Sequence, residues 1–219
     1  MKRNNYKLLA FTLAEVLITL GIVGMIAQMT IPTLMQNVQK NVVITQLQKV
    51  TSSLGQSILL SIGEGNSLAT PANNLATDNA AVKAFLLPYL KVMTTCENSE
   101  LTCGLTTTKC LHNANAGLAL GASAYRYILT DGSSIGFNVG SAGKYRLHVD
   151  VDGPTKGRNR MGYDTFLINI DANPPALSKL VPGQYYETDG QGCADDNHNS
   201  GAYCYDRVVT EGWNLNYWK

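Results

Sequence analysis

The chain has 219 residues, of which 45% are hydrophobic and only 15% are charged. This length suffices for one sizeable domain or two small ones. The formal net charge of +1 gives no bulk attraction to nucleic acid, and no basic cluster is interleaved with aromatic residues, so nucleic-acid binding is not expected. The low charge and 20 glycines are typical of a turn-rich exported domain.

An apolar segment follows a positively charged N-terminus. Residues 1–7 carry three positive charges and no acid, and Phe11 to Leu34 contains no Lys or Arg. As a helix rising ~1.5 Å per residue, this segment spans the ~30 Å hydrocarbon core of a membrane. It is longer than the apolar region of a secretory signal, and no small-residue cleavage site follows it. We therefore predict one membrane-spanning helix with its positive end in the cytoplasm.

Two residues are unusual in this segment. A charged acid inside a membrane costs a few kcal/mol, so Glu15 is a candidate functional residue. The alternative is that Glu15 lies near the membrane interface, where its charge costs little. Pro32 lacks a backbone N–H and should kink or locally melt the helix. The hydroxyls of Thr30 and Thr33 are placed to bond the freed carbonyls.

The pattern becomes amphipathic after Pro32. Apolar residues recur at spacings of three and four, at Val43, Leu47, Val50, Leu54, Ile58 and Ile62. This spacing predicts one long helix from about Phe11 to Ile62, stopped by Gly63 and Gly65. We expect its first half to lie in lipid or in a filament core and its second half to pack on a globular domain. The region 35–60 holds no Gly/Ser/Pro-rich linker, which argues against a separate anchor.

The region after this helix is predicted to contain a loop, a short helix and several strands. Residues 66–79 are small and polar and indicate a loop, and Ala80 to Val92 indicates a short helix that ends near Leu87, before Pro88. Alternating apolar residues predict four antiparallel strands, the first two joined by an Asp-Gly turn. The four strands are Tyr125–Thr130, Ser134–Val139, Tyr145–Val151 and Asp164–Ile170. The apolar residues of the last two alternate, which places each set on one face of its strand: Leu147, Val149 and Val151, and Phe166, Ile168 and Ile170.

All five cysteines lie after residue 95, at Cys96, Cys103, Cys110, Cys193 and Cys204. This distribution fits disulfides formed outside the cytoplasm, and the odd count leaves one thiol or one intermolecular bridge. The first three are spaced by seven residues, whereas zinc sites favour cysteine pairs two to four residues apart. We therefore expect a small disulfide loop, with Cys96–Cys110 and Cys103–Cys110 as the alternatives.

The segment AFTLAEVLITL, residues 10–20, resembles the cleavage and methylation motif of type IV pilins and type II secretion pseudopilins. The resemblance implies that a prepilin peptidase cuts between Ala10 and Phe11 and methylates the new amine of Phe11. It also implies that Glu15 neutralises the N-terminal amine of a neighbouring subunit during assembly. Pro32 lies where many family members have a helix-breaking proline. The residue before the cut is usually Gly, so Ala10 is expected to slow processing.

The same resemblance implies the fold, organisation and location of the chain. The expected fold is α+β and pilin-like, with a long N-terminal helix packed on a small antiparallel sheet with disulfide-stapled loops. The expected parts are a leader (1–10), a transmembrane and assembly half-helix (11–35), an amphipathic half-helix (36–62) and a globular domain (63–219). The chain would cross the inner membrane once, with its globular domain outside the cytoplasm, and then join a filament in the periplasm or at the cell surface.

The loop DVDGPTKGRNRMGYDTF, residues 150–166, resembles a segment of the pseudopilin-like group, and some members bind calcium in a nearby loop. Asp150, Asp152 and Asp164 offer hard oxygen ligands that suit Ca²⁺. The alternative is a turn without metal, in which the aspartates pair with the loop's basic residues, Lys156, Arg158 and Arg160. No glutamate closes an EF-hand pattern. We expect no required cofactor, with calcium as the alternative.

The C-terminal region contains a second cysteine loop. A disulfide between Cys193 and Cys204 resembles the C-terminal loop that many pilins staple, and by the chain-entropy model it is worth roughly 2–3 kcal/mol. The aromatic residues near the C-terminus are expected to pack back on the sheet or to form a binding patch: Trp213, Tyr217 and Trp218.

The leading functional hypothesis is a structural subunit of a type IV pilus-like or type II secretion pseudopilus filament. Its expected partners are further copies of itself, other pilin-like subunits, a prepilin peptidase, an inner-membrane assembly platform and the membrane. The first alternative is a membrane-anchored exported binding or adhesion protein that does not form the filament body. An enzyme is not expected, because the histidines are scattered and no known catalytic motif is present.

Overall fold

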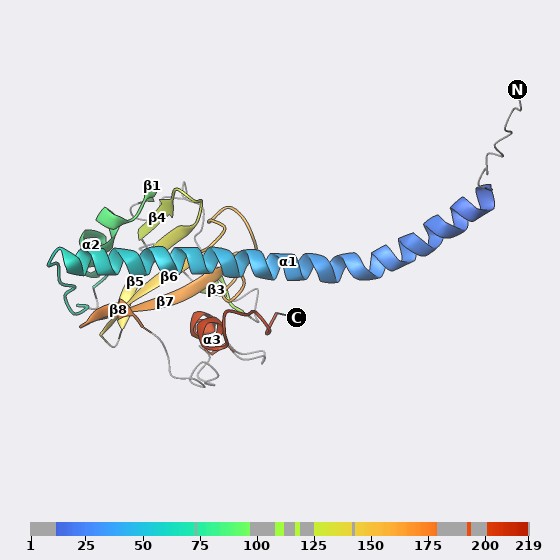
Figure 1. Ribbon diagram of the computed structural model, residues 1–219. Helices are drawn as coiled ribbons and strands as arrows, with labels where there is room; N and C mark the ends of the chain where they lie inside the picture. The colour runs from blue at the N-terminus through green and yellow to red at the C-terminus, as the bar shows by residue number, and fades with distance from the viewer. Residues whose placement is uncertain are drawn as a thin grey trace, which may run out of the picture. The chain divides into compact units, whose positions relative to one another are not determined.

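The computed structural model describes residues 12–72, 74–96, 108–111, 117–118, 125–141, 143–178, 192–193 and 201–218. The longest element is α1, Leu13–Gly63, a continuous helix of 51 residues (Figure 1). The prediction of one long helix is therefore confirmed, and the helix ends at Gly63, one residue beyond the predicted end at Ile62. The chain divides into two compact units at the junction of Asn41 and Val42, so α1 contributes to both.

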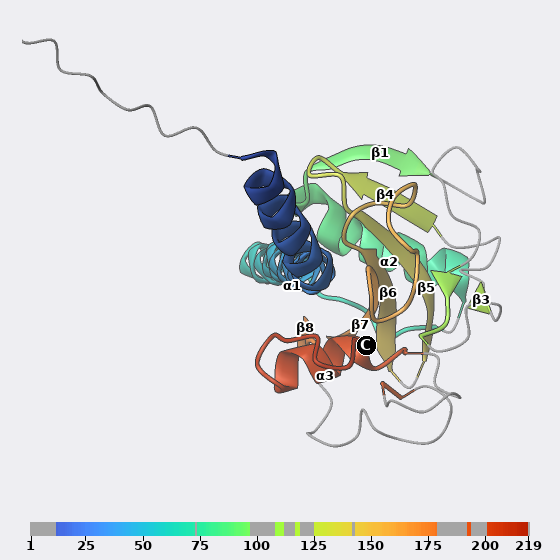
Figure 2. The same cartoon turned by 90° about the vertical axis from the view of Figure 1, so that its right-hand side faces the viewer.

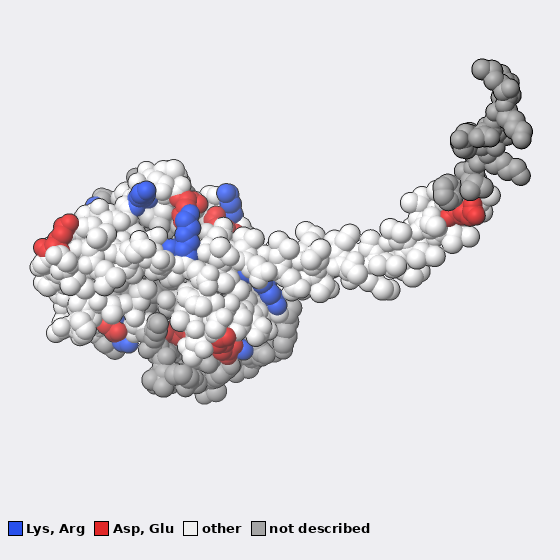
Figure 3. All heavy atoms as spheres, in the orientation of Figure 1, with Lys and Arg blue, Asp and Glu red and all other residues white. Residues whose placement is uncertain are grey.

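The N-terminal half of α1 is an uncharged helix with an exposed apolar surface. No Asp, Glu, Lys or Arg occurs between Glu15 and Lys40, and this stretch is white in Figure 3. The part of α1 before Val42 exposes large apolar side chains on all sides, among them Leu17, Ile18, Leu20, Val23, Met25, Met29 and Leu34. By length and composition, α1 is the one helix among the described residues that is able to cross a membrane.

Pro32 lies inside α1 without interrupting it. The predicted local melting does not occur, although the blue N-terminal part of α1 is visibly curved (Figure 1). Pro32 leaves the Gln28 carbonyl, four residues earlier, without its usual backbone donor. The Thr30 hydroxyl instead bonds the carbonyls of Ile26, at 3.1 Å, and Ala27, at 3.4 Å. Thr30 therefore does not replace the lost bond, and its bonds to the preceding turn are of the kind that bends a helix.

The globular unit is built on a six-stranded antiparallel sheet with strand order β1-β4-β5-β6-β7-β8. The predicted hairpin and the two strands after it are confirmed, and the sheet gains an edge strand on each side that the sequence did not reveal. A separate pair, β2–β3, stands outside this sheet. The strands are β1 (Val92–Cys96), β2 (Thr108–Lys109), β3 (Gly117–Leu118), β4 (Tyr125–Leu129), β5 (Ser134–Ser141), β6 (Lys144–Asp150), β7 (Thr165–Ala172) and β8 (Pro175–Leu177).

The hydrophobic core lies between one face of this sheet and the second half of α1, the cyan part in Figure 1. Leu47, Val50 and Leu54 of α1 are almost completely buried in it. The apolar sets of β6 and β7 stand opposite each other in register, for example Val149 and Phe166, and enter the same core. The amphipathic pattern of the sequence thus identified the face of α1 that packs on the sheet.

Two short helices complete the unit. Helix α2, Leu75–Leu86, begins earlier than predicted, because the Asn74 side chain caps it by accepting a hydrogen bond from the Thr77 amide at 3.2 Å. The 3₁₀ turn Leu87–Tyr89 follows it directly. Helix α3, Cys204–Thr210, was not predicted and lies beside β7 (Figure 2).

The disulfides were predicted in part. Cys193 and Cys204 form the expected disulfide, which joins the start of α3 to the preceding segment. Cys96 is also disulfide-bonded. Cys110, however, is a reduced thiol. Both pairings expected for this region contained Cys110, so both expectations are wrong.

Replacement of Leu54 by alanine tests the packing of α1 on the sheet. Leu54 has no exposed surface, so Leu54→Ala leaves a cavity and is expected to lower the free energy of unfolding of the globular unit by about 2–5 kcal/mol. Leu59, on the same helix, is 71% exposed, and Leu59→Ala should change this free energy by less than about 0.5 kcal/mol. Urea unfolding of both variants in detergent measures the difference. Equal losses would show that α1 does not pack as described.

Candidate functional site

Glu15 occupies the first turn of α1 and forms a capping box with Thr12. The backbone amide and the hydroxyl of Thr12 donate to Glu15 Oε2, at 2.8 and 2.9 Å, and the Glu15 amide donates to the Thr12 hydroxyl oxygen at 3.2 Å. These bonds satisfy amides that the helix itself leaves without partners. The T-x-x-E spacing of residues 12–15 is the sequence signal for this local role.

The Glu15 carboxylate keeps capacity for a further partner. Both bonds from Thr12 end on Oε2, and a carboxylate has about four lone-pair sites. The side chain is exposed, and Oε1 faces no donor among the described residues. Ala10 and Phe11, the expected processing residues, lie outside the described part of the chain. Glu15 is therefore suited both to cap its own helix and to accept a cation from outside this chain.

The loop between β6 and β7 folds around the carboxylate of Asp164. This carboxylate accepts hydrogen bonds from three successive backbone amides, those of Arg158, Asn159 (2.7 Å) and Arg160 (2.6 Å). The loop begins at Asp150, the last residue of β6, and Asp164 immediately precedes β7. The sheet therefore fixes both ends of the loop, and Asp164 holds its middle in place.

All three predicted aspartates converge in this loop. A Cβ atom added at Gly157, which has φ +70°, would overlap carboxylate oxygens of both Asp152 and Asp164. Asp152 also lies within hydrogen-bonding reach of Asp150. Asp150 Oδ1 accepts the Gly153 amide at 3.0 Å. Asp150 Oδ2 and Asp152 Oδ1 are buried and accept no bond from an amide or a basic side chain of the described residues, so a proton on one carboxyl group is what can join the two.

The electrostatics of this cluster are unfavourable for three ionised carboxylates. Burial is the largest cause that raises the pKa of Asp150 from 3.8 to about 8, and the neighbouring Asp152 and Asp164 raise it further. Burial also raises the pKa of Asp164, although its three amide donors oppose this. The buried Arg126 of β4 is the cation that acts on Asp150 from the sheet. The chain alone therefore favours a proton on Asp150 at neutral pH.

The loop's arginines do not neutralise this cluster. The guanidinium groups of Arg158 and Arg160 lie over the ring of Tyr163, 4.9 and 5.1 Å from its centroid. Arg160 Nε also donates to the Cys110 carbonyl at 3.1 Å. Among the described residues, no salt bridge joins a basic side chain of the loop to any of the three aspartates. The ion pairs expected as the alternative to calcium are therefore not formed.

The donor set of the loop suits a hard cation, because it consists of carboxylate oxygens. In the described part of the chain, however, no three or more His, Cys, Asp or Glu side chains are already arranged to hold a metal ion. The three aspartates therefore supply the right ligand chemistry but not a finished coordination shell.

The C-terminal aromatic residues pack on the hydrophobic core, as expected, and Tyr217 and Trp218 also bond to this loop. The Tyr217 hydroxyl and Trp218 Nε1 both donate to the Gly162 carbonyl, at 2.7 and 2.8 Å. The rings of Tyr163 and Trp218 stack with their centroids 4.8 Å apart. The loop thus connects the aspartate cluster to the C-terminal segment.

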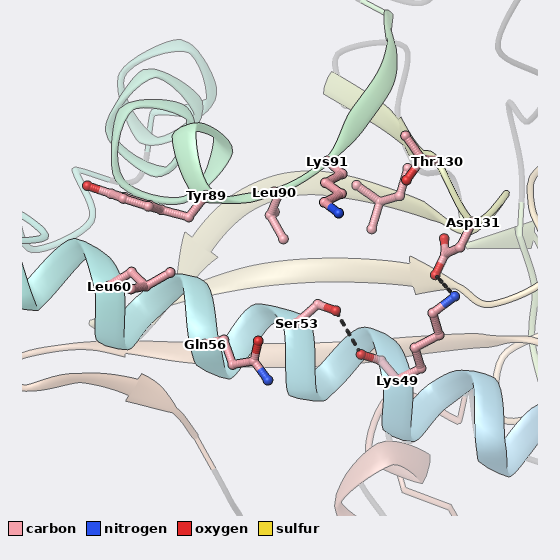
Figure 4. Close-up of a pocket in the computed structure, with 10 residues that line it drawn as sticks. Lys49, Ser53, Gln56, Leu60, Tyr89, Leu90, Lys91, Thr130 and Asp131 are labelled. Atoms are coloured by element: carbon pink, nitrogen blue, oxygen red, sulfur yellow. Dashed lines mark hydrogen bonds and ion pairs between the residues drawn. The ribbon is translucent and has the colours of Figure 1, made fainter.

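A groove of about 410 Å³ lies between α1 and the β4–β5 hairpin (Figure 4). Lys49 of α1 crosses one end of it to pair with Asp131 at 3.1 Å. Burial alone would raise the pKa of Asp131, but bonds from Ser133 and the charge of Lys49 outweigh it and lower the pKa. The Tyr89 hydroxyl at the other end donates to Glu64. These pairs tie α1 to the hairpin and to the 3₁₀ turn, and they are structural.

Comparison of the chain with protein-family models, with curated proteins and with solved structures finds no match. The geometry of the Glu15 turn and of the groove therefore provides the basis for the functional proposals below.

Proposed function

We propose that this chain is a structural subunit of a type IV pilus-like or type II secretion pseudopilus filament. The observation that carries the proposal is the N-terminal half of α1, which exposes large apolar side chains and has one acid, Glu15, in its first turn. An apolar surface of this length must be covered by lipid or by other apolar helices. A bundle of such half-helices from several copies would cover it outside the membrane.

Glu15 then selects how the helices align. After cleavage behind Ala10, the amine of Phe11 carries a positive charge close to Glu15. Either charge alone is unfavourable inside an apolar bundle, and pairing across subunits lowers both penalties. The proposed partners are therefore other copies of this chain or similar subunits, a prepilin peptidase and an assembly platform in the inner membrane. The proposed location is that membrane, with the globular unit outside the cytoplasm.

The capping box favours a second candidate function. Because Thr12 already binds Glu15, the acid has a local role that requires no neighbouring subunit. The chain would then be a membrane-anchored exported binding or adhesion protein whose helix serves only as the anchor. The filament proposal requires the charge of Glu15, whereas the anchor proposal requires only its hydrogen bonds with Thr12.

Intact mass spectrometry tests the processing step on which the filament proposal depends. Coexpression with a prepilin peptidase is expected to remove Met1 to Ala10 and to add about 14 Da to the new N-terminus at Phe11. An Ala10→Gly variant, which restores the usual residue before the cut, should be processed faster. An inactive peptidase serves as the control. If both chains keep their full mass in the presence of active peptidase, the filament proposal is wrong and the anchor proposal takes its place.

A further inference from the structure

We propose that the groove between α1 and the β4–β5 hairpin binds the carboxyl-terminal end of a partner polypeptide, with the terminal carboxylate on Lys91 and apolar side chains on the leucines of the groove. This inference concerns the globular unit and does not depend on the filament role of α1. The groove volume of about 410 Å³ lies within the usual range of ligand sites in proteins. Its lining also combines apolar surface with a small number of polar side chains, as such sites do.

Lys91 is a cation of the groove that has no counter-ion among the described residues. Its amine points from the edge of the sheet towards α1 (Figure 4), and no described residue forms an ion pair with it. The Thr130 amide donates to the Lys91 carbonyl at 3.0 Å, which fixes the backbone of Lys91. Lys49, the other lysine of the groove, is already paired with Asp131. One positive charge is thus available, which complements a single carboxylate better than a doubly charged phosphate.

The two ends of the groove limit the length of its ligand. The Lys49–Asp131 pair crosses one end at 3.1 Å (Figure 4), and the bond from the Tyr89 hydroxyl to Glu64 ties α1 to the 3₁₀ turn at the other. The lining residues of α1 run from Lys49 to Leu60, a rise of about 16 Å at ~1.5 Å per residue. An extended chain covers this length with about five residues. The groove therefore fits a short ligand or the end of a chain.

The position of Lys91 favours the carboxyl end of a chain. Lys91 is bonded to Thr130, the residue before Asp131, so it lies beside the end of the groove that the Lys49–Asp131 pair crosses. A chain that reaches Lys91 from the open side of the groove therefore ends there rather than passing through. The C-terminal carboxylate of such a chain would form a charge-assisted hydrogen bond with the Lys91 amine.

The lining of the groove favours a peptide over a fatty acid or an acidic sugar. Leu60 is 56% exposed on α1, and Leu90 and Leu129 line the opposite side. An acidic sugar would bury hydroxyl groups against these leucines without hydrogen bonds. The polar side chains of Gln56 and Thr130 also line the groove, and a hydrocarbon chain would cover them without bonding to them. A peptide supplies both apolar side chains and backbone hydrogen-bonding groups.

The partner is a different polypeptide rather than a second copy of this chain. The C-terminal segment of this chain packs on its own core, where Tyr217 is 4% exposed and donates to the Gly162 carbonyl at 2.7 Å. A neighbouring copy therefore does not offer a free apolar end. The lining residues of α1 all lie after the division at Val42, so the groove belongs to the globular unit alone.

A library of peptides with free carboxyl termini tests the proposal. The last four positions are random, the N-termini are attached to beads, and the beads are incubated with the labelled full-length chain in detergent. Beads that capture the chain are expected to carry apolar residues in the last positions. The same library with amidated termini should capture the chain about tenfold less well or worse, because the charge-assisted bond to Lys91 is lost. Equal capture by the two libraries overturns the proposal.

Two lysine variants locate the carboxylate. Lys91→Met keeps the apolar stem of the side chain but removes its charge, and it should weaken binding of the best library peptide about tenfold in fluorescence anisotropy. Lys156→Met removes another exposed lysine, in the loop between β6 and β7 and outside the groove, and should leave the affinity unchanged. Both lysines are exposed, so neither variant should unfold the chain. Equal affinities of the two variants overturn Lys91 as the carboxylate site.

A leucine variant and a fatty acid test the apolar part of the groove. Leu60→Ser should weaken binding of the same peptide about fivefold, because apolar surface of the groove is lost. Leu59→Ser changes a neighbouring exposed leucine that does not line the groove, and should have no effect. Equal effects of the two variants overturn docking along α1. Decanoate, a carboxylate on a hydrocarbon chain, should not displace the peptide at equal concentration, and its displacement of the peptide overturns the assignment to a polypeptide end.

Discussion

A Glu15→Gln chain is expected to be cleaved normally but to enter filaments roughly a hundredfold less well than the unchanged chain. Glutamine can replace glutamate in a capping box, so the bonds with Thr12 are retained. The negative charge, however, is lost, and the N-terminal amine of a neighbouring subunit would stay unpaired in an apolar bundle. An uncompensated buried charge is unfavourable by about 3 kcal/mol or more, which corresponds to this factor.

Thr12→Ala is the matched control for this experiment. It removes the cap, at a cost of about 0.5–2 kcal/mol of helix stability, but it keeps the charge of Glu15. Filament incorporation should therefore persist in Thr12→Ala and fail in Glu15→Gln. Quantitative immunoblotting of sheared filaments, with processing checked by mass, measures both variants. The reverse pattern would show that Glu15 acts only as a cap, and the membrane-anchor function would then be favoured.

The elements predicted correctly from the sequence are those whose apolar pattern repeats over many residues. Helix α1 repeats its apolar spacing over several turns, and the Asp131-Gly132 turn defines the β4–β5 hairpin. Strand β1 was missed because three successive residues, Met93 to Thr95, are exposed and show no alternation. It becomes a strand by pairing with β4 at the sheet edge. Strand β8 is only three residues long and begins with a proline, so it has no pattern of its own.

The start of α2 was missed for a different reason. Its first residues are polar, and sequence reasoning assigned them to a loop. In the structure Asp78 and Asn79 are buried, and Asp78 accepts a hydrogen bond from the Ala72 amide at 2.7 Å. These polar residues are buried because tertiary contacts satisfy them, which periodicity alone does not reveal.

For the aspartate loop, the sequence identified the acidic residues but not the contacts that the arginines make. The three aspartates that the sequence grouped in one loop do converge, because this loop starts and ends on two adjacent strands. The positions of Arg158 and Arg160 could not be predicted, because both rest on Tyr163. Tyr163 in turn stacks on Trp218, which is distant in the sequence and reaches the loop only through the fold of the C-terminal segment. Pairing by charge alone therefore gave the wrong partners.

Gly162→Ala is expected to lower the free energy of unfolding of the globular unit by about 2–5 kcal/mol. Gly162 has φ +75°, a conformation that costs an L-residue about 1–2 kcal/mol. A Cβ atom there would also approach Cys204 Sγ to 2.7 Å and Leu111 Cδ1 to 2.9 Å. Cys204 is held by its disulfide and Leu111 is buried, so neither moves away easily. The resulting overpacking should cost a further 1–3 kcal/mol or so.

Gly143→Ala separates these two contributions. Gly143 has φ +76°, almost the same backbone conformation, but a Cβ atom there would have no neighbour within 4 Å. Gly143→Ala should therefore show the backbone penalty alone, about 1–2 kcal/mol. The difference between the two variants, measured by urea unfolding in detergent, is the packing contribution of the loop. Because Gly162 also receives the bonds from Tyr217 and Trp218, limited proteolysis should release the chain end earlier in Gly162→Ala only. Equal unfolding energies and equal proteolysis in the two variants would mean that the C-terminal segment does not pack on this loop.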